Sequence, residues 1–334
     1  MDDFLVCVQN LAVYHALVVA MRERWDGKKG WEVKELGLPS QFLSLDMDIT
    51  LDAEGRCTKI ILSQHSAISD LVERFPYQLS ARSASTPMTS GDIVGDHVMS
   101  KLLPNNNQYS SLIGSFIYFA TCTRADISHA VSILSKFSAA PTVAQWEAAK
   151  RLLQYLRDNR YLGLCYQHTS SEFKLTVFSD SSYAECKDTR KSQTGVAILA
   201  AGTLVNWVSK RQVTPAIATA EAEYQALSSA AREILWLKSL TADLGFFFAH
   251  LTIQCDSTGA IGWSNEWKRD PKAKHIDIIH HWIKDLVKDK RLRVIYVNTK
   301  DNQADPFTKT LEAKLFWIFV KLNGMISVLP SIPL

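Results

Sequence analysis

The C-terminal half of the chain predicts an α/β fold with a mixed sheet and flanking helices. Residues 175–180, 251–256 and 294–297 are rich in β-branched and aromatic side chains, as strands are. A helical periodicity over residues 219–240 separates the first two of these runs. Strands and helices that alternate along a chain in this way pack as layers around a sheet.

The N-terminal half predicts shorter elements. Residues 4–21 are apolar and predict a strand followed by a helix; a signal peptide is excluded because Asp2 and Asp3 precede them where a basic segment would be. Residues 31–75 mix strand and helix patterns around a turn at 53–55. The Ser- and Thr-rich segment 80–107 then predicts a linker.

Helical patterns follow the linker at 109–121, 126–138 and 143–157. A second boundary is expected near 169–171. From there the predicted order is three strands, a helix, a strand, one or two helices, a strand and a last helix.

Composition limits the function classes. A chain of 334 residues is long enough for two domains with sizeable cores. Its net charge of +3 excludes a bulk polyanion binder, so a nucleic-acid surface has to be local. The six cysteines form no C-x-x-C pair, which argues against a zinc knuckle or a disulfide framework and suits a reducing compartment.

Four carboxylates stand where strand ends or helix ends deliver side chains to one point. Asp180 and Asp256 close two of the strand runs. Asp305 precedes Pro306, which predicts a helix N-cap with proline at the first helical position. Glu223 lies in the long helix. Such a cluster predicts two hard divalent cations, because Mg²⁺ prefers oxygen ligands.

The helix offers two glutamates, and periodicity selects between them. Glu223 shares a face with the apolar positions 227, 230 and 234, whereas Glu221 lies on the polar face. A charge on the buried stripe needs a compensating partner such as a metal ion. The alternative, that Glu223 marks a fraying helix end and reaches water, stays open on periodicity alone.

Seven short motifs, in order and at similar separations, resemble the ribonuclease H domain of copia-type (Ty1/copia) retrotransposon Pol polyproteins. They include Phe178-Ser179-Asp180, Cys255-Asp256 and Gln303-Ala304-Asp305, and the others are residues 190–195, 207–212, 221–227 and 274–277. The upstream segments 109–118, 123–127 and 148–156 resemble the part of such a polyprotein that precedes ribonuclease H. Residues 1–4 resemble the back half of the Tyr-x-Asp-Asp turn of a reverse transcriptase palm.

The resemblance implies a domain order and a fold. The expected divisions are a remnant of reverse transcriptase palm and thumb at 1–80, a linker and helical connection region at 81–168, a ribonuclease H domain at 169–315, and a C-terminal helix and tail at 316–334. The implied fold is the mixed sheet of ribonuclease H with flanking helices. Reverse transcriptase activity is not expected, because the upstream palm aspartate of the family has no counterpart in this sequence.

The resemblance also implies an activity, which is endonucleolytic cleavage of the RNA strand of RNA/DNA hybrids by two-metal hydrolysis. Asp180, Glu223, Asp256 and Asp305 are the implied catalytic and metal-binding residues, with two Mg²⁺ ions that Mn²⁺ can replace. Arg190, Lys191 and Ser192 match a family motif and are the implied substrate-binding residues. The basic residues between 268 and 293 and the tryptophans at 263, 267 and 282 are further substrate candidates, with solvated faces and core packing as the alternatives.

The implied partner is an RNA/DNA hybrid, with other retrotransposon Pol or Gag products as further candidates and no membrane. The expected location is the cytoplasm, with a virus-like particle or the nucleus as alternatives. One departure from the family pattern is Glu185, which stands where related elements often have glycine and adds a charge near the site.

Rival functions fit less well. A related exonuclease would have Asp-x-Glu on the first strand, and an integrase would end its constellation with glutamate rather than Asp305. The alternative that remains is a catalytically inactive transposon remnant that folds and binds nucleic acid.

Overall fold

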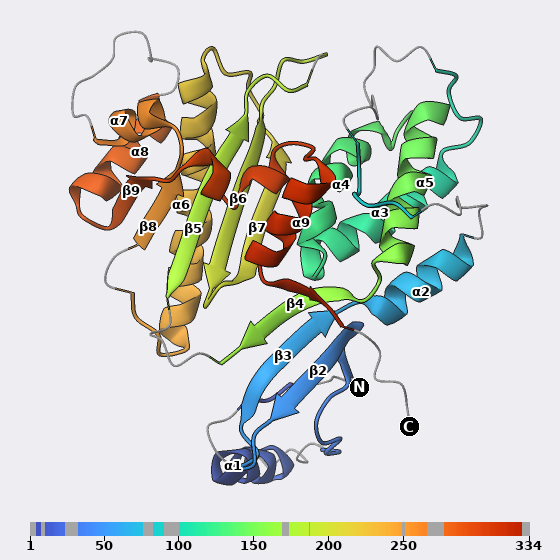
Figure 1. Cartoon of the computed structure of the whole chain (residues 1–334). Helices are drawn as coiled ribbons and strands as arrows, with labels where there is room; N and C mark the ends of the chain where they lie inside the picture. The colour runs from blue at the N-terminus through green and yellow to red at the C-terminus, as the bar shows by residue number, and fades with distance from the viewer. Residues whose placement is uncertain are drawn as a thin grey trace.

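The computed structural model describes residues 5–7, 11–23, 33–75, 83–89, 100–168, 174–186, 188–248, 251–265 and 277–328. Asp2, Asp3 and the predicted boundary at 169–171 lie outside these ranges, as does the basic segment 266–276. The described residues form two five-stranded sheets with helices around them (Figure 1). The division into four domains stays a prediction.

The first sheet is antiparallel, with the strand order β1-β2-β3-β4-β10. Its strands are β1 (Gln41–Phe42), β2 (Leu45–Leu51), β3 (Cys57–Ser63), β4 (Leu162–Gln167) and β10 (Met325–Ser327). The predicted turn at 53–55 joins β2 to β3, and Asp52 Oδ1 closes it by accepting the backbone N–H groups of Glu54 and Arg56. β10 pairs with β4, so the C-terminal segment returns to the N-terminal half.

The N-terminal half also contributes the first helices of the chain. They are α1 (Leu11–Arg22), α2 (His65–Arg74), α3 (Asn107–Cys122), α4 (Ser128–Leu134) and α5 (Val143–Asp158), with the short 3-10 turns η1 (Ala125–Ile127) and η2 (Ser135–Phe137) around α4. The three helices predicted after the linker are therefore confirmed, the second with 3-10 ends. A capping box begins α5, in which Thr142 N–H donates to Gln145 Oε1 at 2.7 Å.

The second sheet is mixed, with the order β7-β6-β5-β8-β9. Strands β5 (Leu175–Ser182), β6 (Gln193–Ala200) and β7 (Thr203–Arg211) are antiparallel neighbours. β8 (Leu251–Cys255) and β9 (Leu292–Tyr296) follow parallel to β5. The helices between and after them are α6 (Thr219–Asp243), α7 (Thr258–Asn265), α8 (Asp277–Lys288) and α9 (Ala313–Leu322), with the 3-10 turns η4 (Thr299–Asp301) and η5 (Asp305–Phe307). The predicted mixed α/β fold and its order of elements are confirmed.

The two faces of this sheet have separate cores because neighbouring strand residues point to opposite sides. Val177, Val196 and Ile198 pack against α6 and α8 on one face. Phe178 and Leu199 point the other way, into a core shared with α3, α4, α5 and α9 (Figure 1). The helices of residues 107–158 therefore cover the second sheet directly.

No helix in the described part of the chain is both long enough and apolar enough to cross a membrane.

A buried ion pair stabilises the helical region. Arg124 has no exposed surface, and it donates to Asp126 through Nε and Nη2 at 2.9 and 2.6 Å. The Tyr155 hydroxyl donates to the same carboxylate at 2.7 Å, which ties η1 to α5. Removing one partner of such a pair leaves a buried charge uncompensated.

We therefore expect Asp126→Ala to lower the free energy of unfolding by about 3–5 kcal/mol, measured as a large fall in the thermal midpoint. The matched control is Glu54→Ala, which removes an ion-pair partner at 3.0 Å from the exposed Arg56 and should leave the midpoint unchanged. Equal midpoints for the two variants would show that the Arg124 network does not support the fold.

Candidate active site

Parallel strands bring two of the predicted carboxylates to one edge of the second sheet. β5 and β8 run side by side with Ser179 opposite Cys255, so Asp180 and Asp256 occupy neighbouring positions at their carboxyl ends. This edge is where open α/β sheets bind ligands. Asp180 is buried, with 4% of its surface exposed, and Asp256 is half-buried.

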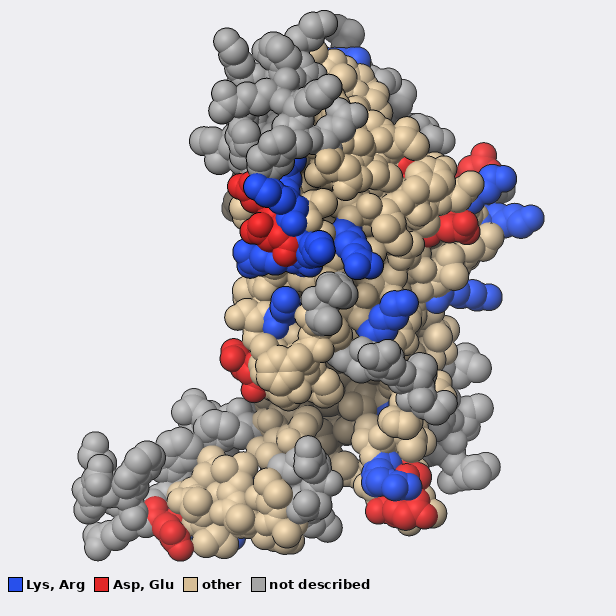
Figure 2. Space-filling model, turned by 90° about the vertical axis from the view of Figure 1, so that its left-hand side faces the viewer, with Lys and Arg blue, Asp and Glu red and all other residues tan. Residues whose placement is uncertain are grey.

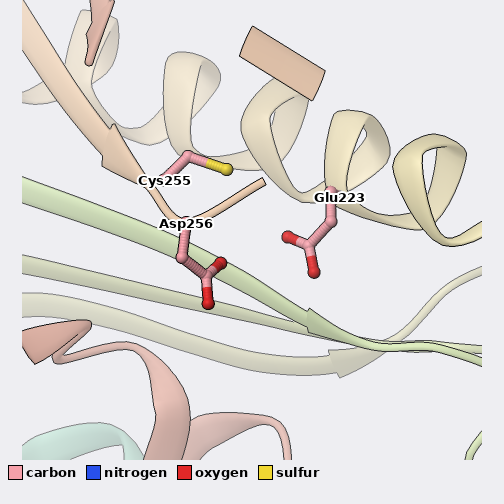
Figure 3. Close-up of side chains that lie close together, drawn as sticks. All are labelled: Glu223, Cys255 and Asp256. Carbon is pink, nitrogen blue, oxygen red and sulfur yellow. The ribbon is translucent and has the colours of Figure 1, made fainter. Parts of the chain in front are cut away.

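Glu223 reaches the same point from the first turns of α6. A carboxylate oxygen of Glu223, one of Asp256 and the Sγ atom of Cys255 all lie within 4.8 Å of one another. Figure 3 shows the two carboxylates turned toward each other across the end of β5. Glu223 is only 5% exposed, so the alternative that it frays into water is wrong.

The predicted exposure of Glu221 is also wrong, because Glu221 is 5% exposed, as Glu223 is. Its Oε2 accepts the Ile217 backbone N–H at 2.8 Å, where the chain folds back before the helix begins. The helical periodicity placed Glu221 on the polar face because it takes no account of the turn before the helix. Its side chain therefore serves the start of α6, while Glu223 faces the carboxylates.

Asp305 arrives with the segment after β9. Ala304 occupies the N-cap of η5 and Asp305 is the first residue of that turn, so the predicted N-cap role of Asp305 is wrong. A three-residue turn gives its carboxylate no N–H to cap, and Lys309 Nζ approaches its Oδ1 at 2.9 Å instead. The Thr308 hydroxyl donates a short hydrogen bond to Asp180 Oδ2, which joins this segment to β5.

Gly195 explains how the segment comes so close. It lies opposite Asp180 in the β5–β6 register. A Cβ atom at this position would lie 2.7 Å from the Ala304 carbonyl oxygen and 2.5 Å from Thr308 Cγ2. Only glycine therefore allows residues 304–308 to lie on β6. The sequence motif at 190–195 contained this glycine, but its spacing gave no sign of the contact.

Burial and mutual repulsion raise the pKa of three of these carboxyl groups, those of Asp180, Glu223 and Asp305. Burial raises the pKa of Glu223 to about 9, and the charges of Asp180 and Asp256 add to the shift. Burial and Asp180 likewise raise the pKa of Asp305 to about 7, against the effect of Lys309. The pKa of Asp180 is raised by burial, although Thr308 and Lys309 oppose this.

This donor set fits divalent cations. Glu223 Oε2 is buried and has no hydrogen-bond partner within the described ranges, and a buried acceptor of this kind needs a cation or a donor. Clustered carboxylates are the oxygen ligands that Mg²⁺ and Mn²⁺ prefer.

The predicted substrate residues differ in their exposure to solvent. Arg190 lies at the surface in a turn with φ of 52°, and Lys191 is half-buried beside it. Ser192 has no exposed surface, and its Oγ accepts the Ala184 N–H at 3.1 Å. Ser192 thus holds the loop after β5, and the substrate role of all three residues stays a prediction. Trp263 and Trp282 pack against the core under α6, and Trp267 lies outside the described residues.

Sequence reasoning missed Thr308 and Lys309, which contact Asp180 and Asp305, and it also missed a histidine near the loop after β5. His129 on α4 is buried, with its Nε2 3.6 Å from Glu185 Oε1. Burial lowers the pKa of His129 to about 4 and raises that of Glu185 to about 7, so this contact is not a full ion pair at neutral pH. Glu185 was noticed as a departure from glycine, but a lone histidine in a helical pattern carries no signal of such a contact.

The comparisons with known proteins show the family of the chain. The chain is 35% identical over 333 residues to the retrovirus-related Pol polyprotein of transposon TNT 1-94 from Nicotiana tabacum. It is 30% identical over 241 residues to a transposon Ty5-1 protein of Saccharomyces cerevisiae, of which it covers 71%. The chain belongs to the copia-type retrotransposon Pol polyprotein family. The predicted resemblance is thereby confirmed.

The chain spans about a quarter of the longer Pol relatives, 24% of the tobacco polyprotein and 22% of that of transposon RE1 from Arabidopsis thaliana. No family model matches it. Among solved structures, a ribonuclease H1 from compost in complex with an RNA/DNA hybrid is 15% identical, with a TM-score of 0.32. The match covers 40% of this chain and 94% of that enzyme.

We expect Gly195→Ala to displace residues 304–308, to destabilise the protein by about 1–3 kcal/mol, and to weaken Mg²⁺ binding in calorimetric titration. Gly114→Ala is the matched control, because a Cβ there meets nothing within 4 Å and alanine favours helix α3. A Gly195→Ala variant that melts and binds Mg²⁺ as the parent protein does would contradict the packing of this segment on β6.

The raised pKa values predict a pH dependence of stability without divalent cations. Folded pKa values of about 7 for Asp305 and about 9 for Glu223 exceed their ordinary values of 3.8 and 4.5. The folded state therefore binds more protons than the unfolded state between those limits, and stability falls as pH rises. Thermal midpoints in chelator should decline from about pH 5 to about pH 9.

Glu223→Gln should flatten that decline above neutral pH, because it removes the carboxyl group whose pKa is about 9. Mg²⁺ should restore the midpoint of the parent protein at high pH, since it binds the ionised form. A midpoint that rises with pH in chelator would show that the carboxylates do not repel one another in the folded state.

Proposed function

We propose that this chain is a ribonuclease H endonuclease that cleaves the RNA strand of RNA/DNA hybrids by two-metal hydrolysis. The observation that carries the proposal is the convergence of Asp180, Glu223, Asp256 and Asp305 from four separate elements. A cluster of four carboxylates whose repulsion Lys309 offsets only in part is costly for a fold, and bound cations would remove that cost.

The four side chains take different roles in this proposal. Asp180 lies at the centre of the group, since Glu223, Asp256 and Asp305 all interact with its charge. Asp180 and Asp256 would hold cations most directly, Glu223 would hold one from the α6 side, and Asp305 would complete the set beside Lys309. When bound, two divalent cations activate a water and stabilise the leaving 3′ oxygen of a phosphodiester.

Lys309 and Thr308 prepare the site from the side of η5. The Lys309 ammonium lies beside Asp305, and Asp180, Asp305 and Asp256 raise its pKa, so it is charged at neutral pH. It offsets part of the repulsion before cations arrive. The Thr308 hydroxyl fixes one oxygen of Asp180 by donating a hydrogen bond to it.

A hybrid would reach the site past the loop after β5. Arg190 and Lys191 lie on this loop and carry the positive charge that phosphates need. A second group, Lys288, Lys290, Arg291 and Arg293, is exposed where α8 leads into β9. Figure 2 shows basic side chains on this side of the molecule mixed with acidic ones, so its attraction for phosphates is local.

The decisive experiment compares two glutamates with the same burial in one helix. Glu223→Gln removes a proposed metal ligand and should lower hybrid cleavage in Mg²⁺ by about 10³-fold or more, as Asp256→Asn should. Glu221→Gln keeps an oxygen for the Ile217 N–H and should retain most of the activity. Cleavage of a labelled hybrid, with double-stranded DNA as the substrate control, measures all three.

Two outcomes would contradict the proposal. If Glu221→Gln were inactive and Glu223→Gln active, the ligand assignment on α6 would be wrong. If the parent protein bound the hybrid but cleaved nothing in Mg²⁺ or Mn²⁺, the chain would be an inactive transposon remnant that retains the fold.

A further inference from the structure

Cys255 gives the site a soft ligand that the proposed hydrolysis does not use. It is the last residue of β8, directly before Asp256, and none of its surface is exposed. Figure 3 shows its sulfur projecting toward α6, on the side from which Glu223 comes. Within the described part of the chain, Glu223, Cys255 and Asp256 are the one group of three or more possible metal ligands whose donor atoms all lie within 4.8 Å of one another.

A second observation indicates that this group lacks a partner for one of its oxygens. Glu223 Oε2 is buried and unpartnered within the described ranges, and the Glu223 carboxylate is turned toward Asp256 (Figure 3). A buried acceptor left in this state is a costly feature unless a cation fills its valence.

We propose that Glu223, Cys255 and Asp256 form a site for one thiophilic divalent ion, such as Zn²⁺ or Cd²⁺, with a sulfur and two carboxylate oxygens as its ligands. Thiolate sulfur favours these ions, whereas Mg²⁺ is hard and binds oxygen. The two classes of ion would therefore differ in their ligands at this site, because only the thiophilic ions would bind the Cys255 sulfur.

The geometry needs little adjustment. With Zn–S and Zn–O bonds of about 2.3 and 2.0 Å, two ligand atoms on a tetrahedral ion lie about 3.5 Å apart. The three donor atoms are within 4.8 Å before any ion binds. Rotation of the flexible Glu223 side chain closes this gap. As the metal–sulfur and metal–oxygen bonds form, the Cys255 thiol proton and the Glu223 carboxyl proton leave to the buffer.

Occupancy by such an ion would use two of the four carboxylates and so exclude the Mg²⁺ pair. This inhibitory consequence rests on the proposed hydrolase activity, whereas the binding of the soft ion does not. Zn²⁺ should therefore inhibit hybrid cleavage in competition with Mg²⁺.

The test is a Cd²⁺ titration of the full chain under reducing conditions, followed by the ultraviolet absorption of the cadmium–thiolate bond. We expect one equivalent to produce the band in the parent protein. Cys255→Ala should abolish the tight phase, and Glu223→Gln should weaken it by about tenfold or more. The matched control, Cys57→Ala, removes an exposed thiol far along the sequence and should leave the titration unchanged.

Each outcome of the titration either supports or overturns the proposed metal site. A tight band that persists in Cys255→Ala, or one that is absent from the parent protein, overturns the site. If Cys255→Ala does not fold, Glu223→Gln decides alone, and undiminished Cd²⁺ affinity in that variant is equally fatal. A tight Cys255-dependent band in a protein that cleaves no hybrid supports the site while refuting the proposed function. Hybrid cleavage without the band does the reverse.

Discussion

The buried carboxylates at the ends of β5 and β8 repel one another, and the surrounding structure has to compensate for this repulsion. Asp180, Glu223 and Asp305 are all buried or nearly so, and burial raises the pKa of each. The chain compensates only in part. Lys309 stands beside Asp305 and Thr308 donates to Asp180, but Glu223 Oε2 has no partner within the described residues. Protons or metal ions have to supply the rest.

The support for this arrangement extends well beyond the second sheet. Residues 304–308 lie on Gly195 and are tied down by Ser209, whose Oγ donates to the Phe307 carbonyl at 2.6 Å. Phe307 belongs to the core that α3, α4 and α5 share with that sheet. Trp207 Nε1 also donates to the Ala120 carbonyl, which joins β7 to α3. The helical region therefore helps to position the segment that carries Asp305.

Sequence patterns predicted the helices, the strands and the convergence of the acidic residues more reliably than they predicted the contacts of individual side chains. Long periodic segments such as α6 showed both their existence and the inward face of Glu223, because apolar spacing is decided along one helix. Glu221 was misjudged because its partner, the Ile217 N–H, lies in a turn outside that periodicity. The Arg124–Asp126–Tyr155 network and the His129–Glu185 contact join residues 29 and 56 positions apart, and no local pattern reports such pairs.

Protonation relieves the repulsion between these carboxylates, and a bound cation would relieve it in the same way, so the stability of the fold and its metal affinity are linked. Without cations, the folded chain lowers the repulsion by taking up protons, so Glu223 with its pKa of about 9 is mostly neutral at neutral pH. A metal ion binds the ionised form and has to displace those protons, which makes metal affinity rise with pH over the range in which the metal-free fold weakens. Under the proposed function, neutral Glu223 is the resting state of a metal ligand. The same burial that disfavours its charge excludes the water that would otherwise weaken a bound cation's hold on its ligands.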